Sequence, residues 1–227
     1  MVNIWPWLRE RIMEIQHFTW DSKTGDTRLY WDYLRLRKRI FVDERHWPMP
    51  CFKGAEFDFY DLPFASYVFL THKDGSLAAG LRLIRADNVV DYNGQRLTYM
   101  INDAFHRRLP TIPRQVSNQP PPTDSRTWEL SRIVSTGGLK ATGLLVKGAA
   151  DVIRQLGAKR MIFLGNPQFR KLGHYLGFDV EALGPVIGSA ESDAEDARYQ
   201  AMVGTDRLAL RDAGAAGTGA VSADLAA

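Results

Sequence analysis

The stretch "TWELSRIVS", residues 127–135, has the β-branched and apolar residues of a buried strand, but it also carries Glu129 and Arg132. On a regular strand, residues three apart point to opposite faces of the sheet, so one of these charges would enter an apolar layer. A β-bulge, a feature common beside active sites, would place both on the same face. One polar cluster shared with Asp58 and Asp61 would then satisfy both charges.

Composition predicts one substantial core. The 227 residues are 45% hydrophobic and 11% aromatic, which suits one domain better than two. We expect a single domain over residues 1–211 and a disordered tail over 212–227, where bulky apolar residues are scarce. The formal charge of +3 is too small to indicate nucleic-acid binding.

Cysteine and histidine usage predicts no structural metal. A single cysteine, Cys51, forms no internal disulfide, and the five histidines show no ligand spacing. The longest apolar runs, residues 66–71 and 161–165, are far shorter than a bilayer span, and the N-terminus lacks a signal-peptide core. We therefore expect a cytoplasmic protein.

Hydrophobic periodicity and turn residues divide the chain into alternating elements. A helix follows the N-cap candidate Asp26, a hairpin turns at Asp74-Gly75, and two Pro- or Gly-rich loops cover residues 48–63 and 106–126. The remaining expected elements are strands at 11–20, 127–135, 160–165, 179–188 and 198–204 and helices at 143–156 and 166–177.

The order of these elements predicts a mixed α/β protein. Antiparallel strands come first, and a crossover helix then leads into a strand that pairs in parallel. We expect a three-layer α-β-α sandwich with a mixed sheet, the fold of the N-acyltransferases (GNAT-like). Fold alone does not identify a reaction.

Charged and aromatic residues in unusual local settings provide the functional signal: Arg37, Phe41, Trp47, Glu56, Asp58, Asp61, Arg82, Glu129 and Arg132. The segments "RLRKRIFVDERHW", "EFDFYD", "GLRLI" and "WELSR" resemble the signature of the acyl-homoserine-lactone synthases of the LuxI type. Eight positions match in order and spacing, all of these residues except Glu56, and the resemblance runs from about residue 29 to 178.

The resemblance implies a transferase that makes a quorum-sensing autoinducer. An acyl group passes from a thioester to the amine of S-adenosylmethionine, and lactone closure then releases methylthioadenosine. S-adenosylmethionine is a consumed co-substrate, so no recycled cofactor is implied. Glu129, Arg132, Asp61 and Arg82 become the expected catalytic residues.

The substrate's sulfonium, ammonium and carboxylate require aromatic surface and both signs of charge. Substrate contacts are therefore expected from Arg37, Phe41, Trp47, Asp58 and Phe163. Glu129 is the candidate general base, because an ammonium must lose a proton before it attacks a thioester. Two alternatives remain open: Glu129 only anchors Arg132 while the substrate arrives deprotonated, and the Asp pair serves as loop caps or as ion-pair partners of Arg37 and Arg82.

Two departures bear on the acyl donor. Phe163 stands where many relatives selective for 3-oxo chains have threonine, and "STGGLKATG" does not match the pyrophosphate loop of coenzyme A acetyltransferases. We therefore expect an acyl carrier protein as the donor, and acyl-coenzyme A remains open as an alternative, since some relatives with degenerate loops use coenzyme A donors. A carrier protein is acidic, so a basic docking patch is expected at Lys147, Arg154, Lys159, Arg160, Arg170 and Lys171, whose charges are equally compatible with a solvated surface.

Two other functions are consistent with parts of the sequence. A coenzyme A-dependent N-acyltransferase acting on another amine would share the fold but release no methylthioadenosine. A non-enzymatic acyl-carrier or RNA-binding module would keep its function in the Glu129→Gln variant, and the lack of basic-aromatic clusters counts against RNA.

Overall fold

The computed structural model describes residues 13–21, 26–92, 94–188 and 198–208, without the side chain of Tyr92. The expected tail at 212–227 and the acidic loop at 189–196 lie outside these residues, as does the start of the first predicted strand. Within the described ranges, no helix is both long enough and apolar enough to cross a membrane.

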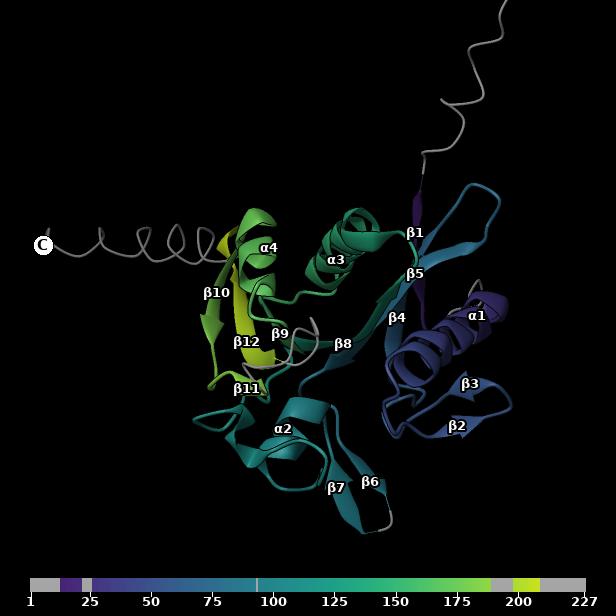
Figure 1. Ribbon diagram of the computed structural model, residues 1–227. Helices are drawn as coiled ribbons and strands as arrows, with labels where there is room; N and C mark the ends of the chain where they lie inside the picture. Colours follow the sequence, from purple (N-terminus) through teal and green to yellow (C-terminus); the bar gives the residue numbers. More distant parts are fainter. Residues whose placement is uncertain (1–12, 22–25, 93, 189–197, 209–227) are drawn as a thin grey trace, which may run out of the picture.

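One mixed sheet forms the centre of the protein (Figure 1). Its strands follow the order β1-β4-β5-β8-β9-β12-β10, with β11 paired to β12. Among the described strands only β8 and β9 run parallel, as expected for the two ends of a crossover unit. The bounds are β1 Glu14–Phe18, β4 Ser66–Thr71, β5 Leu77–Arg85, β8 Thr127–Ser135, β9 Arg160–Gly165, β10 Phe178–Ala182, β11 Ile187–Gly188 and β12 Arg198–Asp206.

Helices cover both faces of this sheet, which confirms the predicted three-layer sandwich (Figure 1). One face carries α3 (Gly138–Gln155) and α4 (Phe169–Tyr175), and the other carries α1 (Thr27–Arg37) and α2 (Met100–Phe105). α1 continues as a π-helix, η1 (Lys38–Glu44), and a 3-10 turn, η2, spans Arg114–Val116. Small hairpins, β2 (Cys51–Phe52) with β3 (Ala55–Glu56) and β6 (Val90–Tyr92) with β7 (Gln95–Leu97), lie outside the main sheet.

Local sequence explains how α1 begins and which face it buries. The carboxylate of Asp26 accepts a hydrogen bond from the Arg28 amide at 2.8 Å, so the predicted N-cap is confirmed. Leu29, Tyr33 and Leu36 recur at helical spacing and are buried against the sheet. Because this apolar stripe packs against the sheet, it determines on which side of the sheet the charged C-terminal end of α1 lies.

The strands β8 and β9 separate part of the way along their length. Their parallel pairing extends from Thr127 opposite Arg160 to Leu130 opposite Phe163, whereas β8 stays paired to β5 as far as Ser135. The backbone after Leu130 thus leaves β9 and opens a splay in the middle of the sheet. This opening determines where the polar groups of β8 become accessible.

Several predicted boundaries are wrong. The crossover helix begins at Gly138, five residues before the expected start, because buried Ala141 extends its apolar stripe through glycines that resemble a turn. α4 is shorter than the predicted helix at 166–177. The β6–β7 hairpin, α2 and the β2–β3 hairpin were not predicted, because each is too short to show periodicity.

Candidate functional site

A bulge in β8 brings its two charges to one face of the sheet. Arg82 lies opposite Ser131, but Gly80 lies opposite Val134, so Arg132 and Ile133 together face a single residue of β5. Arg132 has a φ of +54°, a left-handed conformation that is costly for an arginine. The Tyr33 hydroxyl donates to the Arg132 carbonyl at 2.8 Å and holds this conformation. The predicted bulge is therefore present.

Arg37 is completely buried and is neutralised by two carboxylates. Its Nη1 and Nη2 donate to the two oxygens of Asp61 at 2.7 and 2.9 Å, and its Nε donates to Glu56. The Tyr67 hydroxyl also donates to Asp61, at 3.2 Å. A bidentate arginine–carboxylate pair of this kind is both strong and geometrically specific.

Asp58 connects the other two arginines of the site. Arg82 donates to its two oxygens at 2.5 and 3.2 Å, and Arg132 Nη2 donates at 2.6 Å. Burial raises the pKa of the Asp58 carboxyl, but Arg82 and Arg132 outweigh burial, so this pKa lies well below its usual range. Asp58 is therefore ionised across the physiological pH range.

Together these groups form a balanced charge network, which contains three arginines and three carboxylates: Arg37, Arg82, Arg132, Glu56, Asp58 and Asp61. Most of it is sealed from solvent. Its exposed edge is the side chain of Arg132, at 15% exposure, next to Asp58 at 9%. A charged ligand therefore meets this network at Arg132 and Asp58.

Glu129 lies on the same face of β8 but has a different environment. Its carboxylate accepts hydrogen bonds from the backbone amides of Met100 and Ile101, at 3.2 and 3.0 Å, at the start of α2. It is fully buried, and no ion pair joins it to Arg132 among the described residues. Burial raises the pKa of Glu129 to about 7, although the two amides and Arg82 favour the charged form.

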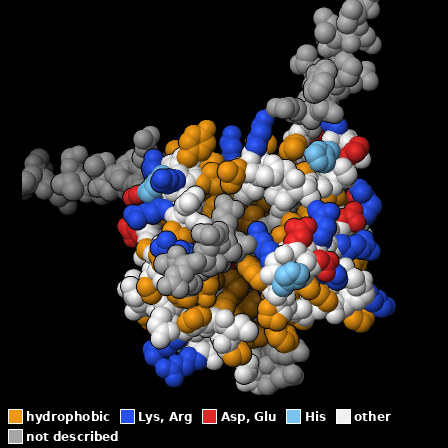
Figure 2. All heavy atoms as spheres, viewed as in Figure 1, with side chains coloured by type: hydrophobic (Ala, Val, Ile, Leu, Met, Phe, Trp, Pro, Cys, Tyr) orange, Lys and Arg blue, Asp and Glu red, His pale blue; other side chains and the backbone are white. Residues whose placement is uncertain are grey.

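Two predicted aromatic residues form a stack at the edge of the charge network. The rings of Phe41 and Trp47 are parallel within 3° and 5.1 Å apart, and the Arg132 guanidinium lies 5.9 Å from the Phe41 ring. Phe41 is buried, while Trp47 is 36% exposed. Figure 2 shows the protein surface hollowed below β8 between α1 and α2, with hydrophobic side chains in the hollow. An aromatic surface is thus available beside the exposed edge of the network.

Phe163 is not part of this cluster. It packs on the α3 side of the sheet, at the last paired position before β8 and β9 separate. There it lines a small apolar crevice of about 40 Å³ with Leu130, Ile133 and Met161. The splay in the sheet lies between this crevice and the charged face.

The six predicted docking residues divide into two groups. Arg154 pairs with Asp206 and Asp151, Arg160 pairs with Asp124 at 2.5 Å, and Arg170 donates to a backbone carbonyl. In the part of the chain that the structure describes, the ammonium groups of Lys147, Lys159 and Lys171 have no such partner. The three arginines thus have partners within the protein, whereas the three lysines show none among the described residues; docking at all six positions stays a prediction.

Three buried polar residues complete the site beyond those predicted. The sequence singles out Glu56 without a role, and the structure places it against Arg37. Ser131 accepts from Arg82 Nε at 3.2 Å, and Asp103 accepts from the Tyr60 hydroxyl at 2.8 Å. The sequence could have indicated a role for Glu56, because it is a charged residue next to the Asp pair. Asp103 gave no such indication, because it lies in a helix too short to be recognised.

The sequence of this chain is similar to those of known proteins. The family model described as autoinducer synthase matches residues 23–136. An acyl-homoserine-lactone synthase of Aeromonas salmonicida is 23% identical over 162 residues, which cover 67% of this chain and 70% of that protein.

Solved structures show the same fold. The coenzyme A-dependent acyl-homoserine lactone synthase BjaI, with SAM and isopentyl-CoA, superposes with a TM-score of 0.67 at 19% identity, covering 93% of this chain and 92% of BjaI. An acyl-CoA N-acyltransferase from Pseudomonas aeruginosa has a TM-score of 0.52 at 16% identity, covering 85% and 99%. The predicted N-acyltransferase-like fold is thereby confirmed.

Proposed function

Because the chain belongs to the autoinducer synthase family, an acyltransferase family that makes acyl-homoserine lactones, we propose that the α1 side of β8 binds S-adenosylmethionine and catalyses this synthesis. The observation that carries the proposal is the buried Glu129, with a pKa of about 7, on the same strand face as Arg132 and Asp58. This strand face thus combines a base, a cation and an anion.

The exposed edge of the charge network supports recognition of the amino-acid end of the substrate. Arg132 has free N–H groups that suit a carboxylate, and Asp58 is an ionised carboxylate that attracts an ammonium. The Phe41–Trp47 stack offers an aromatic face to the sulfonium or the adenine, worth about 0.5–2 kcal/mol. Arg37, Arg82 and Asp61 lie deeper and hold these groups in place.

Acyl transfer begins with the removal of a proton from the ammonium. We assign this step to Glu129, acting directly or through one water, because a base with a pKa near 7 is half ionised at neutral pH and still strong enough to accept the proton. The nitrogen lone pair then attacks the thioester carbonyl. Backbone N–H groups of β8 beyond Leu130, where it leaves β9, are placed to stabilise the oxyanion.

Lactone closure follows on the same substrate. The carboxylate oxygen forms a bond to the γ-carbon, and the carbon–sulfur bond breaks with its electron pair moving to sulfur. The sulfonium leaves as neutral methylthioadenosine, so this step needs no base and no metal. The protein contributes by holding the oxygen and the γ-carbon in line.

The acyl chain is expected to pass through the splay to the crevice at Phe163. This crevice of about 40 Å³ is too small for an acyl chain in the present arrangement, so a chain enters when side chains move aside. The Phe163→Ala variant is expected to shift the products toward longer chains. Leu172→Ala, which enlarges the same crevice at another lining position, is a second probe, and an unchanged product profile in both variants would place the chain elsewhere.

We propose an acyl carrier protein as the donor, with Lys147, Lys159 and Lys171 as docking residues. Charge reversal of these three lysines is expected to raise KM for the carrier-bound donor and to leave KM for S-adenosylmethionine unchanged. The matched control is charge reversal at Lys73, an exposed lysine in the turn between β4 and β5. Equal effects on both KM values would contradict docking.

A single experiment tests the function as a whole. The purified chain is incubated with labelled S-adenosylmethionine and a panel of acyl-carrier-protein and acyl-coenzyme A thioesters, and the products are identified by mass spectrometry. We expect an acyl-homoserine lactone and methylthioadenosine in equal amounts. Acylation of another amine without methylthioadenosine would indicate the alternative N-acyltransferase.

A further inference from the structure

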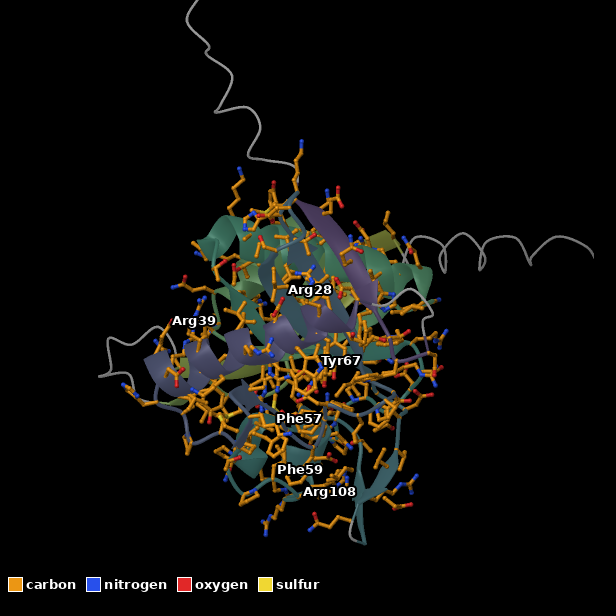
Figure 3. All side chains as sticks on the ribbon, turned by 90° about the vertical axis from the view of Figure 1, so that its right-hand side faces the viewer. Arg28, Arg39, Phe57, Phe59, Tyr67 and Arg108 are labelled. Carbon is orange, nitrogen blue, oxygen red and sulfur yellow. The ribbon has the colours of Figure 1, made fainter. Side chains whose placement is uncertain are left out.

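A second pocket lies at the opposite end of β8 from the splay. It has a volume of about 300 Å³ and is formed by the end of β5, the β6–β7 hairpin, α2 and the loop before β8. Figure 3 shows Arg108 near the β6–β7 end of the molecule, below Phe59, Phe57 and Tyr67 in this view. The pocket lies next to the Glu129 end of the proposed active site, because Met100 and Ile101, whose amides hold Glu129, directly precede Asn102. Its polar lining consists of Asp87, Arg96, Thr98, Asn102, Arg108 and Thr123.

One buried acceptor in this lining has no protein partner. Asn102 is 3% exposed, and its Nδ2 donates to the Thr98 hydroxyl at 2.8 Å, but its Oδ1 has no hydrogen bond among the described residues. The orientation of the amide is fixed by its neighbour, because the Thr98 hydroxyl already donates to Asp103 at 3.0 Å and must therefore accept from Asn102. A buried acceptor left without a donor is costly.

The charges around the pocket favour an anion. Asp87 is paired with Arg85, at 2.5 Å, and the buried Asp103 is paired with Arg108, at 2.9 Å. The side chain of Arg96 forms no ion pair within the described ranges, although Asp91 lies opposite it in the β6–β7 register. The charged residues that line the pocket, Asp87, Arg96 and Arg108, include one carboxylate and two guanidinium groups, so the lining carries a net positive charge. The Nη2 of Arg108 and the hydroxyl of Thr123 add further hydrogen-bond donors to the pocket.

We propose that this pocket binds phosphate, free or as a monoester, in a form that retains one O–H group. Guanidinium groups bind carboxylate, sulfate and phosphate alike, but only an anion with its own proton also donates to Asn102 Oδ1. At neutral pH carboxylates and sulfate have no such proton, whereas inorganic phosphate does. A volume of about 300 Å³ leaves room for the organic part of a monoester.

Binding is measured by isothermal titration calorimetry on the full chain without the synthase substrates, so the result is independent of the proposed function. Inorganic phosphate is expected to bind about tenfold more tightly than sulfate, the difference that one satisfied buried acceptor makes. Glycerol 3-phosphate is the monoester probe. It is expected to bind more tightly as the pH falls through its second pKa of about 6, and tighter binding of this probe than of inorganic phosphate would identify a monoester as the preferred ligand.

Variants locate the site. Arg96→Gln is expected to weaken phosphate binding about tenfold by removing one charge-assisted contact, and the exposed Arg107→Gln outside the pocket is the matched control. Asn102→Leu is expected to abolish the preference for phosphate over sulfate, with its folding checked by thermal unfolding. Equal affinities for phosphate and sulfate in the unaltered protein, or binding unaffected by Arg96→Gln, would overturn the proposal, whether or not the Asn102 variant folds.

Discussion

Asp58 and Glu129 are carboxylates on the same side of the sheet, but Asp58 lies at the exposed edge of the charge network and Glu129 is fully buried. Asp58 receives hydrogen bonds from Arg82 and Arg132, and its pKa lies well below the usual range. Glu129 receives two backbone N–H groups and no arginine, and burial raises its pKa to about 7. One carboxylate is therefore permanently charged, and the other exchanges its proton near neutral pH.

This difference separates the two tasks of the site. A network of fixed charges orients a charged substrate but accepts no proton, because its carboxylates are already committed to arginines. A carboxylate such as Glu129, which is held by backbone amides instead of arginines, can accept a proton, but it depends on the surrounding structure to keep it in position. The bulge at Arg132 lets the two environments share one strand.

Breaking the charge network is expected to have the largest effect on stability. Asp61→Asn leaves the charge network with three arginines and two carboxylates, so one buried positive charge is uncompensated, which typically costs about 3–5 kcal/mol in the free energy of unfolding. Chemical denaturation measures the loss. Asp43→Asn is the control, because its pair with Lys38 is exposed and should contribute less than about 1 kcal/mol. Similar losses in both variants would contradict a structural role for the network.

Removing the proton acceptor is expected to affect catalysis rather than folding. Glu129→Gln should lower kcat by about 10²–10⁴-fold, the usual contribution of a general base. The unaltered enzyme should lose activity as the pH falls through about 7, because Glu129 becomes protonated there.

The pH profile separates a catalytic role from a merely positional one. In Glu129→Gln the acidic limb of kcat against pH should disappear along with most of the rate. If the limb persists at the same pH, another group titrates, and the substrate arrives already deprotonated.

The free energy of unfolding should decrease with rising pH, because the pKa of Glu129 is raised in the folded protein. Its pKa is about 7 in the folded protein against an ordinary value of 4.5, so between these values the folded state holds a proton that the unfolded state has lost. The free energy of unfolding should therefore fall as pH rises from 4.5 to about 7, by roughly 2–3 kcal/mol in total. Asp58, whose pKa is lowered, contributes stability that is lost only at more acidic pH.

Urea unfolding at several pH values in this range measures the slope, and Glu129→Gln provides the control. This variant should show a flat dependence over the same interval. A slope that is unchanged in the variant would assign the proton to a different buried group.

The sequence predicted those parts of the site and fold that depend on residues close together in the chain. The conflict between Glu129 and Arg132 on one short strand predicted a bulge, and β8 contains it. The N-cap of α1 lies directly before its helix. Each signal lies within a few residues of the feature that it predicts.

The surroundings of Glu129 could not be predicted in the same way. α2 has only six residues, and its N-cap residue, Tyr99, provides no side-chain cap. The capping carboxylate is Glu129 itself, which lies 28 residues beyond Ile101 in the chain. Neither the helix nor its partner shows a local pattern, so only the folded structure reveals that the Glu129 carboxylate is held by backbone amides.

The smallest expected effect concerns the aromatic edge of the charge network and tests whether that edge contacts substrate. Trp47→Leu keeps an apolar side chain but removes the aromatic face stacked on Phe41, and loss of a cation–π contact of about 0.5–2 kcal/mol should raise KM for S-adenosylmethionine roughly 2- to 30-fold. The control is Trp31→Leu, an exposed tryptophan of α1 that contacts Tyr30.

KM for the acyl donor and the acidic limb of the pH profile should not change in either variant, because Trp47 touches neither the thioester nor Glu129 in this arrangement. A rise in KM for S-adenosylmethionine confined to Trp47→Leu places the sulfonium or adenine at the exposed edge of the network, whereas equal values in the two variants place it elsewhere in the site.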